Sequence, residues 1–273
     1  MSKLRKALDK AKEAREGLAE DIIIDDKISS PLRTSPAKKQ EQRFEKINPV
    51  YHYTAIKQID FQNLENNKII SICHGNAVAD QLKILRTQIL SQLKKLQENS
   101  LLITSANPGE GRTVTAINLA IALSQQIDGT VLLVDADLRK PSIHSLLGFD
   151  AENGLSDYLR GKAEIADLLV NPGMHRLVVL PGGKPIPNSS ELLGSPRMED
   201  LVNELKERYT DRIIIFDSPP LLTSADSLVL SRFIDGILMV VEAEKTTRED
   251  LKRAIELLRD KPVIGTILNK IQQ

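Results

Sequence analysis

The sequence predicts an α/β fold, with a mainly parallel central sheet and helices on both of its faces. Uninterrupted apolar runs recur between residues 101 and 268, and such runs are typical of strands that are buried on both faces. Segments with helical periodicity lie between these runs. A glycine-rich turn joins the first of these strands to the helix that follows it.

The individual elements follow from these patterns in chain order. A short apolar run covers residues 69–72. We expect strands at 101–104, 131–134, 176–181, 213–216, 236–241 and 263–268. We expect one helix at 80–96 and a second that follows the glycine-rich turn and contains Ile117 and Ala122. We expect two more helices, from Pro196 to about Tyr209 and at 248–258. Ser195 suits the N-cap of the helix that Pro196 opens.

The composition changes near Asn66, where a polar and poorly patterned stretch gives way to the alternating elements. We therefore predict an amino-terminal extension, helix plus linker, over residues 1–66 and one globular domain over residues 67–273. Helical spacing at 4–18 permits two interpretations: a docking helix for a partner or an anionic membrane surface, or a solvated, weakly amphipathic helix. Residues 29–45 have the composition of a linker.

The bulk composition excludes several classes of protein. The 37 Lys and Arg residues balance 37 Asp and Glu residues, so no nucleic-acid partner bound through bulk charge is expected. Cys73 is the single cysteine, which excludes an internal disulfide and a cysteine-rich metal site. The sequence has neither an apolar run of membrane-spanning length nor a secretory signal at its charged start. We expect a cytoplasmic protein, with any contact to the inner membrane made through a partner.

Residues 105–113 lie between an apolar strand and an amphipathic helix, which is the context of a phosphate-binding loop. Glycines let backbone N–H groups converge on a phosphate, and the helix amino terminus adds a favourable dipole. The Thr113 hydroxyl stands where it would bind the Mg²⁺ of a nucleotide. The expected nucleotide contacts are Asn107, Pro108, Gly109, Glu110, Gly111, Arg112, Thr113 and Val114.

The loop departs from the pattern G-x-x-x-x-G-K-S/T at two positions. Ala106 replaces the first glycine, and Arg112 replaces the lysine. Lysine is a compact point charge, whereas arginine is longer, planar and forked, so Arg112 keeps the charge but changes its placement. The alternative interpretation is a strand–helix turn that is rich in glycine for steric reasons.

Three acidic residues end predicted strands. Asp135 and Asp137 follow the second strand, and Asp217 follows the fourth. Buried carboxylates are costly unless they meet a cation or hydrogen-bond donors, and Mg²⁺ prefers oxygen ligands. The alternative for each is a helix cap after the strand. The three acids together with the loop favour a Mg²⁺-nucleotide site.

Together, the loop, the run at 135–139 and the segment Asp217-Ser218-Pro219-Pro220 resemble the bacterial tyrosine autokinases of capsule and exopolysaccharide synthesis. The resemblance covers about residues 69–270 and is nearest to the cytoplasmic autokinases of exopolysaccharide and exosortase loci. Within that range it includes residues 139–142, 154–159, 181–183 and 191–195, and residues 2–11 also resemble that subgroup. It implies a P-loop NTPase fold related to the partitioning ATPases, with ATP and Mg²⁺ as cofactors.

The resemblance also implies roles for single residues. One of Asp135 and Asp137 helps to bind Mg²⁺, and the other orients or deprotonates the tyrosine hydroxyl. Asp217 holds Mg²⁺ through water, and Asn269 contacts adenine. The implied catalytic residues are Asp135, Asp137 and Arg112, and the implied metal ligands are Thr113, Asp137 and Asp217.

Family members carry an E-x-x-R-x-x-R segment that mediates ring assembly. Asp80, Lys83 and Arg86 take these positions here, which implies a homo-oligomer; an ordinary charged helix face is the alternative. A membrane polysaccharide co-polymerase is the other implied partner.

Many family members end in a tyrosine-rich tail, whereas residues 269–273 contain no tyrosine. The tyrosines are Tyr51, Tyr53, Tyr158 and Tyr209. Tyr158 and Tyr209 are expected in helices, and Tyr51 and Tyr53 are either phosphate acceptors or packing residues.

Three functions are consistent with these residues. The first is an ATP-dependent protein-tyrosine kinase that regulates polysaccharide synthesis and export. The second is a nucleotide-binding regulatory partner of the co-polymerase with weak catalysis, which Arg112 and the missing tyrosine tail favour. The third is a partitioning or positioning ATPase, although residues 105–111 lack the additional lysine usual in that class.

Overall fold

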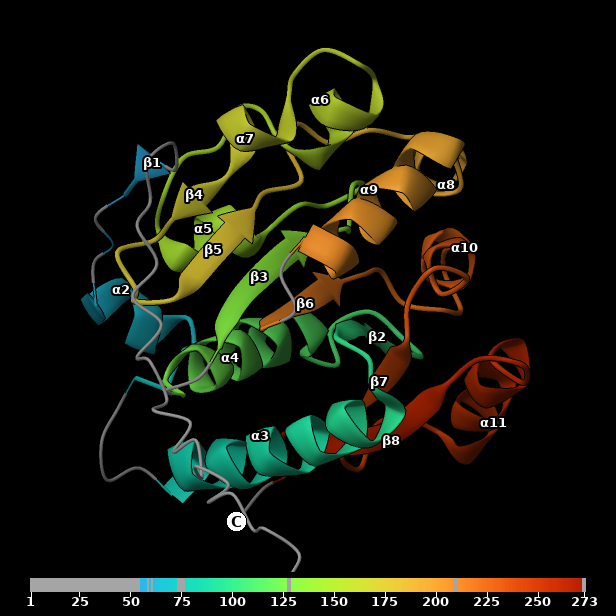
Figure 1. Cartoon of the computed structure of the whole chain (residues 1–273). Coiled ribbons are helices and arrows are strands. Elements are labelled where there is room, and N and C mark those ends of the chain that lie inside the picture. Colours follow the sequence, from blue (N-terminus) through green and yellow to red (C-terminus); the bar gives the residue numbers. More distant parts are fainter. Residues whose placement is uncertain are drawn as a thin grey trace, which may run out of the picture. The chain divides into compact units, whose positions relative to one another are not determined.

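The computed structural model describes residues 55–57, 59, 61–72, 77–126, 129–208 and 211–271 (Figure 1). The expected helix at 4–18, the linker at 29–45, Tyr51, Tyr53, Cys73 and Tyr209 lie outside the described residues.

The strands of the described residues form one eight-stranded sheet, in the order β1-β4-β5-β3-β6-β2-β7-β8. The bounds are β1 Ala55–Ile56, β2 Ser100–Ser105, β3 Thr130–Asp135, β4 Val170–Asn171, β5 Leu177–Leu180, β6 Arg212–Asp217, β7 Gly236–Glu242 and β8 Val263–Asn269. Every neighbouring pair is parallel except β4 and β5. The mainly parallel sheet predicted from the sequence is confirmed, whereas the two-residue strands β1 and β4 gave no periodic signal.

Ten helices lie within the described residues. Their bounds are α2 Phe61–Asn66, α3 Ala77–Leu96, α4 Arg112–Ser124, α5 Ile143–Leu147, α6 Leu155–Leu159, α7 Ile165–Leu168, α8 Ser189–Leu193, α9 Pro196–Arg208, α10 Asp226–Leu230 and α11 Arg248–Leu257. The predicted helices correspond to α3, α4, α9 and α11. The Met198 amide donates to the Ser195 hydroxyl over 3.4 Å, as expected for the cap of α9.

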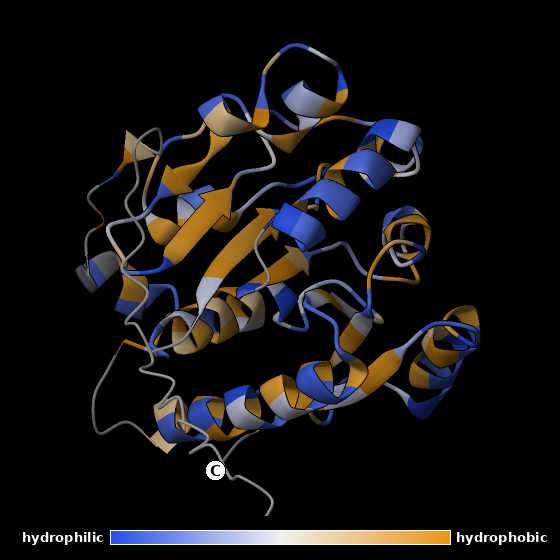
Figure 2. Cartoon of the chain, in the orientation of Figure 1, coloured by the Kyte–Doolittle hydropathy of each residue, from blue (hydrophilic) through white to orange (hydrophobic). Residues whose placement is uncertain are grey.

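The sheet is covered on both faces because successive strand residues point in opposite directions. In β2, Leu102 belongs to the cluster that includes buried residues of α6, α8, α9 and α10, whereas Leu101 and Ile103 join the cluster of α3, α4 and α5. Figure 2 shows the strands as apolar along their length and the helices as mixed. Burial of both faces therefore explains the uninterrupted apolar runs.

Some described elements precede residue 67. Strand β1 pairs with β4, and Leu64 of α2 is fully buried in the cluster that contains α3 and α4. The described fold thus begins before the composition change near Asn66, and the division of the chain at residue 67 stays a prediction.

The topology places three functional segments at one edge of the sheet. Strand β2 leads into the glycine-rich loop and α4, and it pairs with β6, which in turn pairs with β3. Asp135 and Asp217 are partners in the β3–β6 register. Because these strands are parallel, both carboxylates and the loop lie at their carboxyl ends.

We predict that Phe216→Ala lowers the free energy of unfolding by about 3–5 kcal/mol, because its fully buried ring packs in the core at the centre of the sheet. Urea denaturation measures the change. Leu257→Ala is the control, because this side chain is 44% exposed and should cost less than about 1 kcal/mol. Equal losses in the two variants would contradict this assignment of the core.

Candidate nucleotide-binding site

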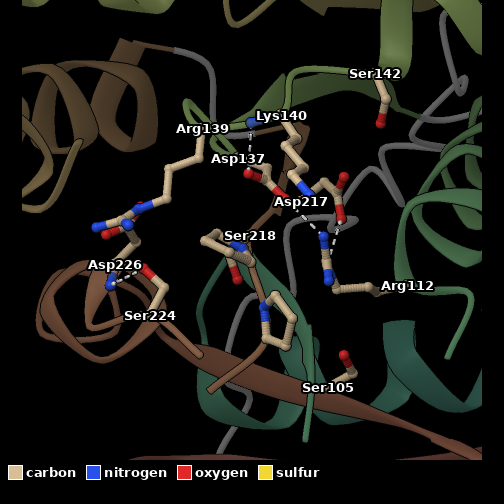
Figure 3. Close-up of polar contacts among 12 residues, drawn as sticks. Ser105, Arg112, Asp137, Arg139, Lys140, Ser142, Asp217, Ser218, Ser224 and Asp226 are labelled. Carbon is tan, nitrogen blue, oxygen red and sulfur yellow. Dashed lines mark hydrogen bonds and ion pairs between the residues drawn. The ribbon is translucent and has the colours of Figure 1, made fainter. Parts of the chain in front are cut away.

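A cavity of about 530 Å³ opens at the carboxyl edge of the sheet, between the glycine-rich loop and the segments that follow β3 and β6. Figure 3 shows side chains from these segments converging on it. The residues that line it are Pro108, Gly109, Arg112, Asp137, Arg139, Lys140, Ser142, Pro219, Pro220, Thr223 and Ser224. Four of the predicted site residues, Pro108, Gly109, Arg112 and Asp137, are thus in its wall.

The loop depends on glycine at two positions. Gly109 and Gly111 have φ values of 82° and 93°, in the left-handed region that side chains with a Cβ rarely adopt. Gly111 also lies against Asn269, since a Cβ on Gly111 would come within 2.2 Å of the Asn269 Nδ2. The steric role of these glycines and the phosphate role of the loop are therefore compatible.

Hydrogen bonds from polar side chains hold the loop in place. The buried Glu110 carboxylate accepts from the Ala106 amide over 3.0 Å and from the Thr246 hydroxyl. The Asn269 amide donates to the Glu110 carbonyl over 2.9 Å, and the Lys270 ammonium donates to the Gly109 carbonyl over 2.6 Å. The Glu110 side chain thus braces the loop, and Asn269 joins the end of β8 to it.

Arg112, the first residue of α4, lies between two of the predicted acids. Its Nη2 is 2.6 Å from an Asp137 oxygen, and its Nε is 3.9 Å from an Asp217 oxygen. The Arg112 side chain is only 13% exposed. In this conformation the arginine compensates part of the negative charge of these acids, so its own charge is already engaged within the protein.

Asp135 combines two features that the sequence analysis treated as alternatives. One oxygen accepts the amides of Ser142 and Ile143 at 2.9 and 3.0 Å, at the start of α5, so it serves as a helix cap. The other oxygen is buried without a hydrogen-bond partner among the described residues. Burial and the Asp217 charge raise the pKa of Asp135 well above its usual range, although the two amides lower it.

The other two acids are also unfavourable as buried anions. Burial raises the pKa of Asp217 to about 6, against the lowering effects of the Arg112 charge and the Thr113 hydroxyl. Burial likewise raises the pKa of Asp137, opposed first by Arg112 and then by the Lys140 amide. A divalent cation would relieve both groups.

The carboxylates fit Mg²⁺ better than a metal held by protein alone. Neither oxygen of Asp217 has a donor in hydrogen-bond geometry within the described part of the chain. No group of three or more His, Cys, Asp or Glu side chains there is arranged to hold a metal ion. Mg²⁺ commonly takes one or two carboxylates, together with water and phosphate oxygens, so Asp137, Asp217 and the Thr113 hydroxyl suit a Mg²⁺-nucleotide.

Comparisons with known proteins identify relatives of this chain. A family model described as an AAA domain matches residues 99–266. The tyrosine-protein kinase YwqD of Bacillus subtilis is 37% identical over 193 residues, which cover 70% of this chain and 80% of YwqD. The chain belongs to the bacterial tyrosine-protein kinases.

Solved structures place the kinase in the same fold. The kinase domain of the Escherichia coli tyrosine kinase Etk superposes with a TM-score of 0.71 at 28% identity, covering 82% of this chain and 90% of that domain. The septum site-determining protein MinD of Pyrococcus horikoshii, solved with Mg-ADP, reaches a TM-score of 0.52 at 25% identity, covering 62% and 69% of the two chains. This kinase is therefore related to the partitioning ATPases, of which MinD is solved with a bound nucleotide.

Several residues that line the cavity had no role predicted from the sequence. Arg139 and Lys140 directly follow the acids of β3, and Thr223 and Ser224 follow Pro220. Two basic residues just after two acids are a signal for an anion site. Residues 219–224 reach the cavity because of the turn that leads to α10, and no local sequence pattern predicts this position.

The residues expected at an oligomer contact lie on α3. Lys83 and Asp80 form an exposed ion pair of 2.7 Å with each other. The Arg86 guanidinium donates to the Ala122 carbonyl over 2.9 Å, near the end of α4. Among the described helices, none is both long and apolar enough to cross a membrane.

We predict that Asp217→Asn stabilises the nucleotide-free kinase at pH 7.5 by on the order of 2 kcal/mol. The folded carboxyl, whose pKa is raised to about 6, keeps its proton to a higher pH than the unfolded one. The wild type therefore loses stability as the pH rises from about 4 to about 6, and the variant does not share this loss.

Urea denaturation between pH 4.5 and 7.5 tests this prediction. The advantage of Asp217→Asn should shrink as the pH falls, and exposed Asp167, changed to Asn, is the control that should show none. A gain that is equal at both ends of the pH range would contradict a cause in the ionisation of Asp217.

We also predict that Gly111→Ala weakens MgADP binding and lowers the free energy of unfolding by about 1–3 kcal/mol, because it strains a left-handed residue and displaces Asn269. Gly265→Ala is the matched control, since its Cβ would meet only Leu238 at an ordinary 3.7 Å. Calorimetric titration and denaturation should separate the two variants; unchanged affinity in Gly111→Ala would oppose the proposed loop geometry.

Proposed function

We propose that this kinase transfers the γ-phosphoryl group of ATP to tyrosine hydroxyls at the cavity formed by the loop and the acids of β3 and β6. The observation that carries the proposal is the convergence of Arg112, Asp137 and Asp217 beside a loop with two left-handed glycines. Phosphoryl transfer needs positioned charges more than covalent chemistry, and this arrangement supplies both signs of charge.

The chain's residues would divide the work as follows. The loop amides and the amino terminus of α4 bind the phosphates, while Asn269, at the end of β8 beside the loop, is proposed to contact adenine. Thr113, Asp137 and Asp217 would hold Mg²⁺, directly or through water. When bound, Mg²⁺ would neutralise negative charge on the phosphates. Arg112 leaves Asp137 and turns to the phosphates, which frees the carboxylate.

In the transfer step, the tyrosine oxygen forms a bond to the γ-phosphorus, and the bond from that phosphorus to the bridging oxygen of ADP breaks. The tyrosine proton passes to a carboxylate. Asp137 lines the cavity, whereas Asp135 is fully buried and holds the start of α5. We assign the orienting or proton-accepting role to Asp137 and a supporting role to Asp135.

The tyrosine that accepts the phosphoryl group is proposed to lie outside the described residues or on another protein molecule. Tyr158 lies on α6, and the Arg197 guanidinium stacks over its ring at 4.4 Å, so Tyr158 is a packing residue. Tyr51, Tyr53 and Tyr209 are outside the described residues. Acceptors on a second copy or on another protein fit a role in regulating capsule or exopolysaccharide synthesis and export.

Two kinds of partner accompany this proposal. Asp80 and Lys83 are exposed on α3 and suit a contact between copies of the chain, whereas Arg86 already bonds to α4. A membrane polysaccharide co-polymerase would bring the kinase to the inner membrane from the cytoplasm. The contact between copies follows from the family resemblance together with the exposure of Asp80 and Lys83, and the co-polymerase follows from the family resemblance alone.

A second candidate function rests on one observation, the 2.6 Å ion pair between Arg112 and Asp137. If Arg112 stays with Asp137 after nucleotide binds, the chain is a nucleotide-dependent regulator with little turnover. Arg112→Lys shortens the side chain and replaces its fork with a point charge. Turnover that appears only in Arg112→Lys would favour the regulator over the kinase.

We predict that Asp137→Asn lowers the rate of phosphotyrosine formation by about 10²–10⁴-fold, because it removes a metal ligand and the acceptor of the tyrosine proton. Purified protein is incubated with MgATP and a tyrosine-containing peptide, and phosphotyrosine is measured by mass spectrometry. Exposed Asp167, changed to Asn, serves as the control and should keep the full rate. Undiminished phosphorylation by Asp137→Asn would overturn the proposed mechanism.

A further inference from the structure

Three cations line the cavity, and the described residues engage two of them. Arg112 is 2.6 Å from Asp137 and 3.9 Å from Asp217. Arg139 is 3.5 Å from the buried Asp226 and donates to the Ser189 hydroxyl over 3.0 Å. Lys140 also lines the cavity, but within the described part of the chain its ammonium has neither an ion-pair nor a hydrogen-bond partner.

The backbone fixes where Lys140 begins. Its amide donates to the Asp137 side chain over 3.0 Å and to the Asp137 carbonyl over 3.1 Å, which closes a tight turn after β3. Figure 3 shows the Lys140 side chain extending from this turn toward the Arg112 and Asp137 side chains. Lys140 thus lines the same cavity as Pro108 and Gly109 of the loop, but it belongs to the segment that follows β3.

We propose that Lys140 is the lysine of this phosphate site and that its ammonium binds the terminal phosphate of a nucleoside triphosphate. This inference rests on the proposed nucleotide site. The loop pattern assigns that contact to the position of Arg112, whose charge is engaged by two carboxylates. Lys140 breaks no ion pair to reach a phosphate, whereas Arg112 must give up Asp137.

The chemistry of the two cations supports this division. The Lys140 ammonium, on a flexible stem, can follow a phosphoryl group at once, whereas the Arg112 guanidinium must first leave Asp137. The exposed position of Lys140 leaves its charge strongly hydrated before a ligand binds. Because the ammonium is proposed to contact only the terminal phosphate, Lys140 should raise the affinity for nucleoside triphosphates and leave the affinity for diphosphates nearly unchanged.

A comparison of MgADP with a magnesium complex of a non-hydrolysable ATP analogue isolates this contact. We expect Lys140→Met to weaken binding of the triphosphate analogue about 10-fold or more, the size of a lost charge-assisted hydrogen bond, and to change MgADP binding less than about 2-fold. Lys140→Arg keeps the charge and should lose less. Lys162→Met removes an exposed lysine elsewhere and should leave both affinities unchanged.

A double-variant cycle distinguishes a substitute lysine from a general electrostatic effect. In an Arg112→Lys background the loop regains its usual lysine, so Lys140→Met should then cost less than about 3-fold for the triphosphate analogue. The same loss in both backgrounds, or an equal loss for both nucleotides, would overturn the proposal.

Two other outcomes separate this inference from the function beneath it. Wild type that binds both nucleotides, with Lys140→Met unchanged, overturns the role of Lys140 and leaves the proposed kinase function standing. Wild type that binds neither nucleotide overturns both. Thermal unfolding of Lys140→Met and Lys140→Arg should match the wild type, since the Lys140 side chain is exposed and its ammonium has no hydrogen bond or ion pair within the described residues.

Discussion

The arrangement of this kinase depends on one constraint, which is the placing of three carboxylates at the carboxyl ends of two adjacent parallel strands. Asp135 and Asp217 face each other in the β3–β6 register, and both are fully buried. When two buried carboxylates lie so close together, their negative charges are unfavourable unless a cation compensates them. Arg112 is the cation that the described fold places between Asp137 and Asp217, and the raised pKa of Asp217, about 6, shows that one guanidinium compensates incompletely.

The incomplete compensation connects stability with function. Buried oxygens on Asp135 and Asp217 have no hydrogen-bond partner within the described part of the chain, which lowers the stability of the nucleotide-free protein. The same oxygens suit a divalent cation and its water shell. Binding of Mg²⁺ and nucleotide would then increase the free energy of unfolding of the protein. Around this site the loop is held rigidly by Glu110 and by the end of β8, so that its amides are positioned before a phosphate arrives.

Arginine at the loop position changes how charge is distributed over the site. A lysine there would present a single point charge on a flexible stem, whereas Arg112 reaches two carboxylates from the start of α4. Arg139 is likewise engaged by Asp226. The cavity therefore contains two cations tied to acids and one exposed lysine. Motion of Arg112 away from Asp137 and recruitment of Lys140 are separate events. Only a nucleoside triphosphate would recruit Lys140, so a comparison of MgADP with a triphosphate analogue distinguishes the two.

The sequence by itself determined the mainly parallel sheet, the main helices and the position of the glycine-rich loop, because burial on both faces imposes apolar runs and left-handed turns require glycine. It also indicated Asp135, Asp137 and Asp217, since acids at strand ends are local features. Only the tertiary structure showed that Arg112 pairs with Asp137, that Glu110 braces the loop, and that residues 219–224 complete the cavity. These contacts join residues far apart in the chain, and their partners are chosen by strand order and side-chain direction, which no local pattern records.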